Sequence, residues 1–145
     1  MTRRILLDVN VLIALAEPGH EHYRTAQEWF HNSRKGLWGI CPFTEAGFIR
    51  ITAARSLLPG PLAIQQAIAI LQILKAYPDF WYWHIDESWV NLTAPFAANI
   101  RGHKQITDAY LLGLAIKNGG QLVTFDRGLR FLAGPEFAAH LLILE

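Results

Sequence analysis

Length, composition and charge set the first limits on this chain of 145 residues. Hydrophobic residues make up 52% of the sequence, which argues against disorder and predicts one compact domain over residues 1–145. The apolar runs are interrupted before the roughly 20 residues that a membrane span needs. A net charge of +1 decides neither for nor against a nucleic-acid partner. The single cysteine, Cys41, excludes an internal disulfide and favours the cytoplasm.

The chain opens on a short apolar run, residues 5–7, that predicts a strand buried on both faces. A helical pattern over residues 11–16 follows, and Asp8 lies where the strand gives way to the helix. An ionised carboxylate in such apolar surroundings costs several kcal/mol unless it is hydrogen-bonded, paired or bound to a cation. The compensation for Asp8 must therefore come from other parts of the chain.

The remaining elements alternate between short apolar strands and amphipathic helices, with no repeat and no low-complexity linker. That alternation predicts an α/β fold with a central, mostly parallel sheet of about five strands. The expected strands cover residues 5–7, 37–41, 80–85, 121–125 and 141–144, and the expected helices cover residues 20–33, a segment from Glu45 with Thr44 as N-cap, residues 63–77, a segment capped by Ser88 and a segment capped by Thr107.

Four acidic residues fall at corresponding places in this pattern. Asp8, Glu45 and Asp126 each follow a predicted strand directly or within a few residues. Asp108 begins the helix that returns to the strand preceding Asp126. The first residue of a crossover helix lies at the carboxyl edge of a parallel sheet, where open α/β sheets bind ligands, so all four acids should converge there.

Four carboxylates in one cleft repel one another unless cations neutralise them. Hard divalent ions such as Mg²⁺ or Mn²⁺ prefer all-oxygen ligands, and protein-bound Mg²⁺ commonly shares its coordination shell with substrate phosphate. The acids therefore indicate metal-assisted chemistry on a phosphate ester.

Four motifs, in this order, resemble the PIN-domain ribonucleases, and specifically the VapC-type toxins of type II toxin–antitoxin systems. The motifs are Leu7-Asp8-Val9-Asn10-Val11-Leu12, Pro42-Phe43-Thr44-Glu45, Thr107-Asp108-Ala109-Tyr110-Leu111 and Thr124-Phe125-Asp126-Arg127-Gly128. The resemblance runs nearly from end to end, and the acidic quartet shows no departure from the family pattern.

The resemblance implies a PIN-like three-layer α/β/α sandwich and a Mg²⁺- or Mn²⁺-dependent endoribonuclease. Its expected substrate is structured RNA such as transfer or ribosomal RNA, and its expected partner is a VapB-type antitoxin. Asp8, Glu45, Asp108 and Asp126 would be the catalytic and metal-binding residues, while Asn10 and Thr124 would be supporting polar residues.

Simpler structural roles remain open for the same residues. Asp8 can cap the following helix, Asp108 can complement a helix dipole, and Asp126 can form an ordinary turn. Other functions also remain open: a PIN nuclease of RNA processing, a metal-dependent phosphatase, or a non-catalytic ion-binding interaction module. Phosphatases of the haloacid-dehalogenase type carry a second acid where this chain has Asn10.

Surfaces for partners are less clearly marked. The apolar helix at residues 63–77 and the aromatic residues predict a homodimer that binds the antitoxin. Substrate-binding residues are not identified, because the basic residues fit solvated charges as well as phosphate contacts. These residues are Arg50, Arg55, Arg101, Lys104, Arg127 and Arg130, together with His103.

Overall fold

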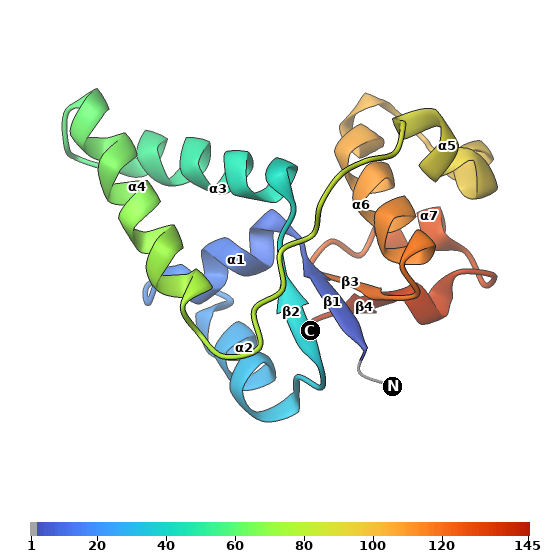
Figure 1. Cartoon of the computed structure of the whole chain (residues 1–145), viewed down its shortest axis with the longest axis horizontal. Helices are drawn as coiled ribbons and strands as arrows, with labels where there is room; N and C mark the ends of the chain where they lie inside the picture. The colour runs from blue at the N-terminus through green and yellow to red at the C-terminus, as the bar shows by residue number, and fades with distance from the viewer. Residues whose placement is uncertain (1–2) are drawn as a thin grey trace.

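A parallel sheet of four strands forms the centre of the protein in a computed structural model, which describes residues 3–145 (Figure 1). The strands are β1 (Arg4–Leu7), β2 (Leu37–Gly39), β3 (Gln121–Thr124) and β4 (Leu141–Ile143). Their spatial order is β2-β1-β3-β4, and all neighbouring pairs are parallel. The predicted α/β class and parallel sheet are confirmed.

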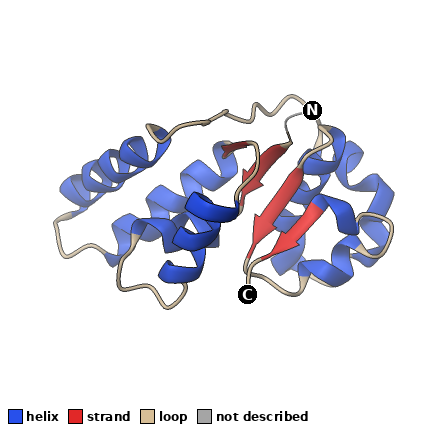
Figure 2. Cartoon of the chain, turned by 90° about the horizontal axis from the view of Figure 1, so that it is seen from below, coloured by secondary structure: helices blue, strands red, loops and turns tan. Residues whose placement is uncertain are grey.

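Helices cover both faces of this sheet, which gives the three layers seen in Figure 2. Side chains alternate across the strands, so Ile5 and Val123 pack on one helical layer while Leu6 and Leu122 pack on the other. The first layer comprises α1 (Val9–Ala16), α2 (Tyr23–Glu28) with the π-helical turn Trp29–Ser33, α3 (Pro42–Arg55) and α4 (Gly60–Lys75). The second layer comprises α5 (Trp89–Thr93), the 3-10 helix Ala94–Asn99, α6 (Ile106–Lys117) and α7 (Leu129–Ala133). Two shorter 3-10 helices, His103–Gln105 and Ala138–His140, precede α6 and β4.

The segment 80–85 accounts for the difference between about five predicted strands and four observed ones. It runs alongside β2, and the amides of Trp81 and Trp83 donate to the carbonyls of Trp38 and Ile40 at 2.8 and 2.9 Å. Only one bridge, Trp38 with Phe80, satisfies a strand pairing. A Cβ at Gly39 would overlap the Trp81 carbonyl oxygen, so the close approach of this segment requires glycine there.

Two predicted N-caps, Thr44 and Thr107, are wrong. Helix α3 begins at Pro42 with Cys41 as N-cap, because proline suits the first helical turn. Thr44 is therefore inside the helix, and its buried hydroxyl donates to the Leu7 carbonyl at 3.3 Å. Helix α6 begins at Ile106 after Gln105, so Thr107 is not its N-cap. The predicted cap at Ser88 is confirmed, since its Oγ accepts from the Asn91 amide at 3.1 Å.

None of the helices within residues 3–145 is long and apolar enough to span a membrane.

Candidate active site

Asp8 is fixed by hydrogen bonds to both of its carboxylate oxygens. It follows β1 directly and caps α1, with Oδ1 accepting from the Val9 amide at 2.7 Å. Its Oδ2 accepts from the Thr124 hydroxyl of β3 at 2.8 Å. The side chain is 5% exposed. Asp8 therefore performs the simple capping role and also faces the neighbouring strand.

Thr124 connects Asp8 to two other predicted site residues. Its fully buried hydroxyl accepts from Asn10 Nδ2 at 3.3 Å and from the Asp126 amide at 3.0 Å. Asn10 Oδ1 in turn accepts from the Phe125 amide at 3.3 Å. Both supporting residues thus tie α1 to the loop that follows β3, and this loop carries Asp126.

Asp126 and Asp108 lie close enough to Asp8 for their charges to interact. Asp126 Oδ1 accepts from the Gly128 amide at 2.8 Å. Asp126 therefore also has the turn-forming role that the sequence left open. Asp108 lies half-buried in the first turn of α6. Burial, and then the charges of Asp8 and Asp126, raise the pKa of Asp108 to about 7. Three of the four predicted acids are therefore brought together.

Burial also raises the pKa of Asp8, with a smaller contribution from the charge of Asp126. The hydrogen bonds from Thr124 and Val9 oppose this effect by stabilising the ionised form. No ion pair within residues 3–145 involves Asp8, Asp108 or Asp126. The mutual repulsion of the three carboxylates is thus not relieved by any lysine or arginine of the described chain.

The chemistry of this cluster fits a hard divalent cation. All of its donors are oxygens, and the repulsion among them would be relieved by a positive ion. Within residues 3–145, no three acidic, histidine or cysteine side chains are arranged to hold an ion by themselves. A Mg²⁺ ion bound by one or two of these carboxylates would keep several water or substrate oxygens as ligands.

Glu45 differs from the other three acids because it forms an ion pair. Its carboxylate accepts from Lys75 Nζ of α4 at 2.8 Å and from the Tyr82 hydroxyl at 3.2 Å. Its charge is not among those that raise the pKa of Asp108. Burial, followed by the charge of Glu45, raises the pKa of Tyr82 to about 12.

Sequence reasoning did not identify Lys75 and Tyr82 as partners of Glu45. Lys75 is the last residue of α4, and Tyr82 belongs to the extended segment beside β2, so both contacts depend on tertiary structure. No local pattern in the sequence marks either residue.

The chain matches the family model described as the PIN domain over residues 5–135. It is 41% identical over 128 residues to Ribonuclease VapC38 of Mycobacterium tuberculosis, which covers 88% of this chain and 89% of that protein. It is 39% identical over 124 residues to Ribonuclease VapC39 of the same organism, with 86% and 89% covered.

Solved structures share the fold. VapC20 of Mycobacterium tuberculosis, a Sarcin-Ricin loop cleaving toxin, superposes with a TM-score of 0.63 at 16% identity over 89% of this chain and 93% of that one. VapBC2 of Rickettsia felis, bound to a DNA fragment from its promoter, gives a TM-score of 0.65 at 14% identity over 98% and 99%. The match to the family model and the identity to the curated relatives carry the conclusion that this chain belongs to the VapC ribonucleases of the PIN-domain family.

Proposed function

We propose that this protein is a Mg²⁺- or Mn²⁺-dependent endoribonuclease toxin that hydrolyses phosphodiester bonds of structured RNA, such as transfer or ribosomal RNA. The observation that carries the proposal is the cluster of Asp8, Asp108 and Asp126, whose charges interact and which form no ion pair with a cationic side chain of residues 3–145. The identity to VapC ribonucleases over most of the chain supports the same activity.

The proposed ion would bind among Asp8, Asp108 and Asp126, with water or substrate oxygens in the coordination positions that these carboxylates do not fill. When bound, it supplies a Lewis acid for the phosphoryl group and lowers the pKa of an attacking water. Asp8 presents a fixed carboxylate because both its oxygens accept hydrogen bonds. Asn10 and Thr124 orient that carboxylate and the loop that carries Asp126. The protein thus contributes a preformed negative site and a defined orientation.

Glu45 is proposed as the fourth acid of this site. In the structure its carboxylate is paired with Lys75, and both side chains are about a quarter exposed. A role at the metal requires that this pair open or that Glu45 act through water. Glu45 directly follows Thr44, whose hydroxyl donates to the carbonyl of Leu7, the residue before Asp8. The backbone of Glu45 is therefore close to the site.

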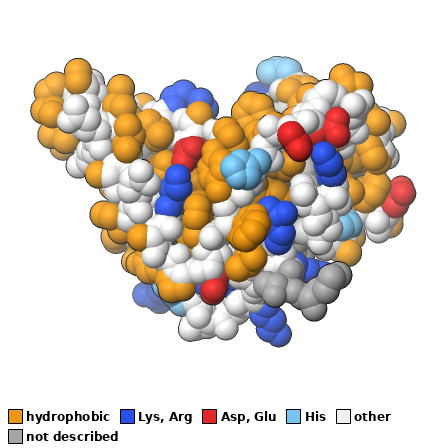
Figure 3. All heavy atoms as spheres, in the orientation of Figure 1, with side chains coloured by type: hydrophobic (Ala, Val, Ile, Leu, Met, Phe, Trp, Pro, Cys, Tyr) orange, Lys and Arg blue, Asp and Glu red, His pale blue; other side chains and the backbone are white. Residues whose placement is uncertain are grey.

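We further propose a cytoplasmic homodimer neutralised by a VapB-type antitoxin. Several solved structures with this fold are toxin–antitoxin complexes, including one from Klebsiella pneumoniae. For the dimer, α4 exposes apolar side chains on both sides of its buried stripe. Figure 3 shows hydrophobic side chains gathered over the lobe that α3 and α4 form. The exposed ones on α4 are Leu62, Ile64, Ile68 and Ile73.

Asp108→Asn is expected to lower metal-dependent cleavage of total cellular RNA roughly 100-fold or more, because it removes a ligand charge. Asp108 accepts no hydrogen bond within the described chain, so the fold should be retained, whereas Asp8→Asn would also disturb the bonds to Val9 and Thr124. The measurement compares RNA fragments with Mg²⁺, Mn²⁺ or EDTA. Asp86→Asn, an exposed acid paired with Lys117, is the matched control. Cleavage that persists in EDTA or in folded Asp108→Asn would contradict the site.

The raised pKa of Asp108 predicts a pH-dependent cost in the metal-free protein. Between about pH 4 and pH 7 the carboxyl is protonated in the native state and ionised in the unfolded state, so native stability falls as pH rises. Asp108→Asn should therefore gain stability relative to wild type across that range, reaching on the order of 1 kcal/mol at pH 8, because solvent screens this half-buried group. Thermal unfolding at pH 5 and pH 8 tests this, and Mg²⁺ should reverse the difference at pH 8. Equal unfolding temperatures at pH 8 without metal would contradict it.

Two variants separate a site role of Glu45 from a structural one. If Glu45 acts at the metal, Glu45→Gln should lose at least about tenfold in cleavage rate, while Lys75→Met should keep or raise the rate by freeing the carboxylate. If the ion pair only joins α3 to α4, both variants should lower the unfolding temperature and leave the rate per folded molecule unchanged. The rates of the two variants, each normalised to folded protein, decide the question.

The double variant Ile64→Glu/Ile68→Glu is expected to convert the dimer to a monomer, because it places two charges on the side of α4 where these two exposed isoleucines lie four residues apart. Sedimentation equilibrium gives the mass. Val90→Glu, which changes an exposed apolar residue of α5, is the control and should remain dimeric. A monomeric wild type, or a double variant that stays dimeric, would show that α4 is not the dimer surface.

A further inference from the structure

A cavity of about 950 Å³ opens beside the candidate active site, between α7 and the edge strand β4. This volume is at the upper end of the range of roughly 300–1,000 Å³ that holds small organic ligands. Its walls are largely apolar and include Phe131, Leu142 and Ile143, while Arg127 and Arg130 also line it. The cavity combines apolar surface with two cations and with one carboxylate, that of Glu145.

The cavity and the acid cluster share one loop. Arg127, which lines the cavity, directly follows Asp126, and the Asp126 carboxylate is bonded to the Gly128 amide of the same turn. Strand β4 forms the cavity wall opposite α7 and pairs with β3. Just after β4, the Leu144 amide donates to the Thr124 carbonyl at 2.9 Å. None of the three clustered acids lines the cavity. It is therefore a separate surface that adjoins the site of the proposed chemistry.

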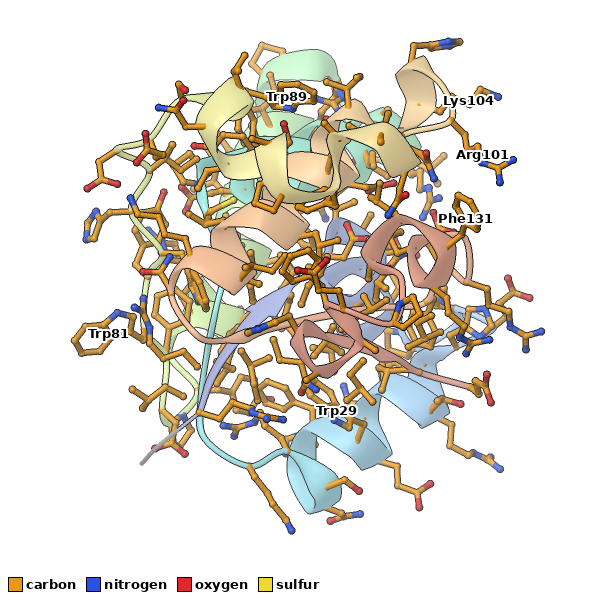
Figure 4. The ribbon with its side chains drawn as sticks, turned by 90° about the vertical axis from the view of Figure 1, so that its right-hand side faces the viewer. Trp29, Trp81, Trp89, Arg101, Lys104 and Phe131 are labelled. Carbon is orange, nitrogen blue, oxygen red and sulfur yellow. The ribbon has the colours of Figure 1, made fainter. Side chains whose placement is uncertain are left out.

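Phe131 provides an exposed aromatic surface at this cavity. The residue is 53% exposed, and the guanidinium of Arg101 lies 3.9 Å from the centre of its ring. Figure 4 shows Phe131, Arg101 and Lys104 following one another along the same side of the molecule. A ring with an adjacent guanidinium is the kind of surface on which nucleobases stack.

The basic residues around the cavity are available for an anion. No ion pair within residues 3–145 involves Arg101, Lys104 or Arg127. Arg130 is paired with Glu145 at 3.5 Å, but both side chains are more than half exposed. Exposed pairs of this kind contribute little, so a phosphate group can replace the carboxylate.

We propose that this cavity binds unpaired nucleobases of the RNA next to the scissile phosphate, with one base stacked on Phe131 and flanking phosphates paired with Arg127 and Arg130. The inference rests on the proposed ribonuclease function and specifies which part of the RNA this surface takes. Charge complementarity favours RNA as the occupant, since cations surround an aromatic surface that adjoins a site for a phosphodiester. An apolar, acidic peptide such as an antitoxin segment is the competing occupant that the experiment distinguishes.

The test is equilibrium binding of a fluorescently labelled single-stranded RNA of mixed sequence, measured by anisotropy in EDTA so that no cleavage occurs. Phe131→Ala should weaken binding about tenfold, and Phe131→Trp should restore it, because stacking needs an aromatic ring. Arg127→Ala and Arg130→Ala should weaken binding and reduce its dependence on salt concentration.

Trp81→Ala is the matched control. Trp81 is 52% exposed and also lies near an arginine, with the Arg4 guanidinium 5.4 Å from its ring, but it projects from a different side of the molecule (Figure 4). Its substitution should leave RNA binding unchanged. Circular dichroism of each variant establishes that the fold is retained.

Wild-type binding that is absent, or that is unaffected by Phe131→Ala and Arg127→Ala, would overturn the proposal. Loss of antitoxin binding in these variants, with RNA binding intact, would identify the cavity as a peptide site and overturn it equally. Failure of the ribonuclease proposal gives a different result, because RNA binding in EDTA needs no metal. Wild type would then bind RNA through Phe131 but cleave none with Mg²⁺ or Mn²⁺.

Discussion

The hydrogen bond between Asp8 and Thr124 is the contact on which the candidate site depends. It joins the carboxyl ends of two adjacent parallel strands inside an apolar sheet, where an unpaired carboxylate would be costly. The Thr124 hydroxyl donates to the Asp8 carboxylate and so offsets part of its desolvation, and it also accepts from Asn10 Nδ2 and from the Asp126 amide. One buried hydroxyl therefore sets the positions of α1 and of the loop after β3. Because these contacts lie within the core, the site is built on rigid elements.

The same arrangement leaves electrostatic strain in the native state. Asp108 lies in the first turn of α6, so the parallel topology brings its carboxylate to the edge already occupied by Asp8 and Asp126. The hydrogen bonds that stabilise the ionised form of Asp8 have no counterpart at Asp108, whose pKa is raised to about 7. The pKa values of both Asp8 and Asp108 are thus raised, and a bound cation would favour the ionised form of each. Metal binding at this cluster would therefore be linked to folding.

The sequence predicts most of the architecture because its strands are buried on both faces and appear as unbroken apolar runs. The alternation of residues 80–85 predicts a strand, yet this segment forms only one bridge with β2 and crosses Gly39 closely, which depends on tertiary packing. For the site, motif positions predicted the approach of Asp8, Asp108 and Asp126, which depends on strand order and direction alone. The pairing of Glu45 with Lys75 and Tyr82 depends on how α4 and the segment after it pack against α3. The local sequence around these residues does not indicate that packing.

An acidic cluster repels a polyanion such as RNA, and the neighbouring cavity offers positive charge that can bind it. RNA approaching Asp8, Asp108 and Asp126 is repelled until cations intervene, whereas Arg127 and Arg130 present positive charge one loop away. Phosphates held by these arginines would lie beside the carboxylates without facing them directly. A base stacked on Phe131 would then fix the register of the strand. In this arrangement affinity for RNA comes from the cavity and the cleavage chemistry from the acids, so substitutions in the two regions should affect binding and catalysis separately.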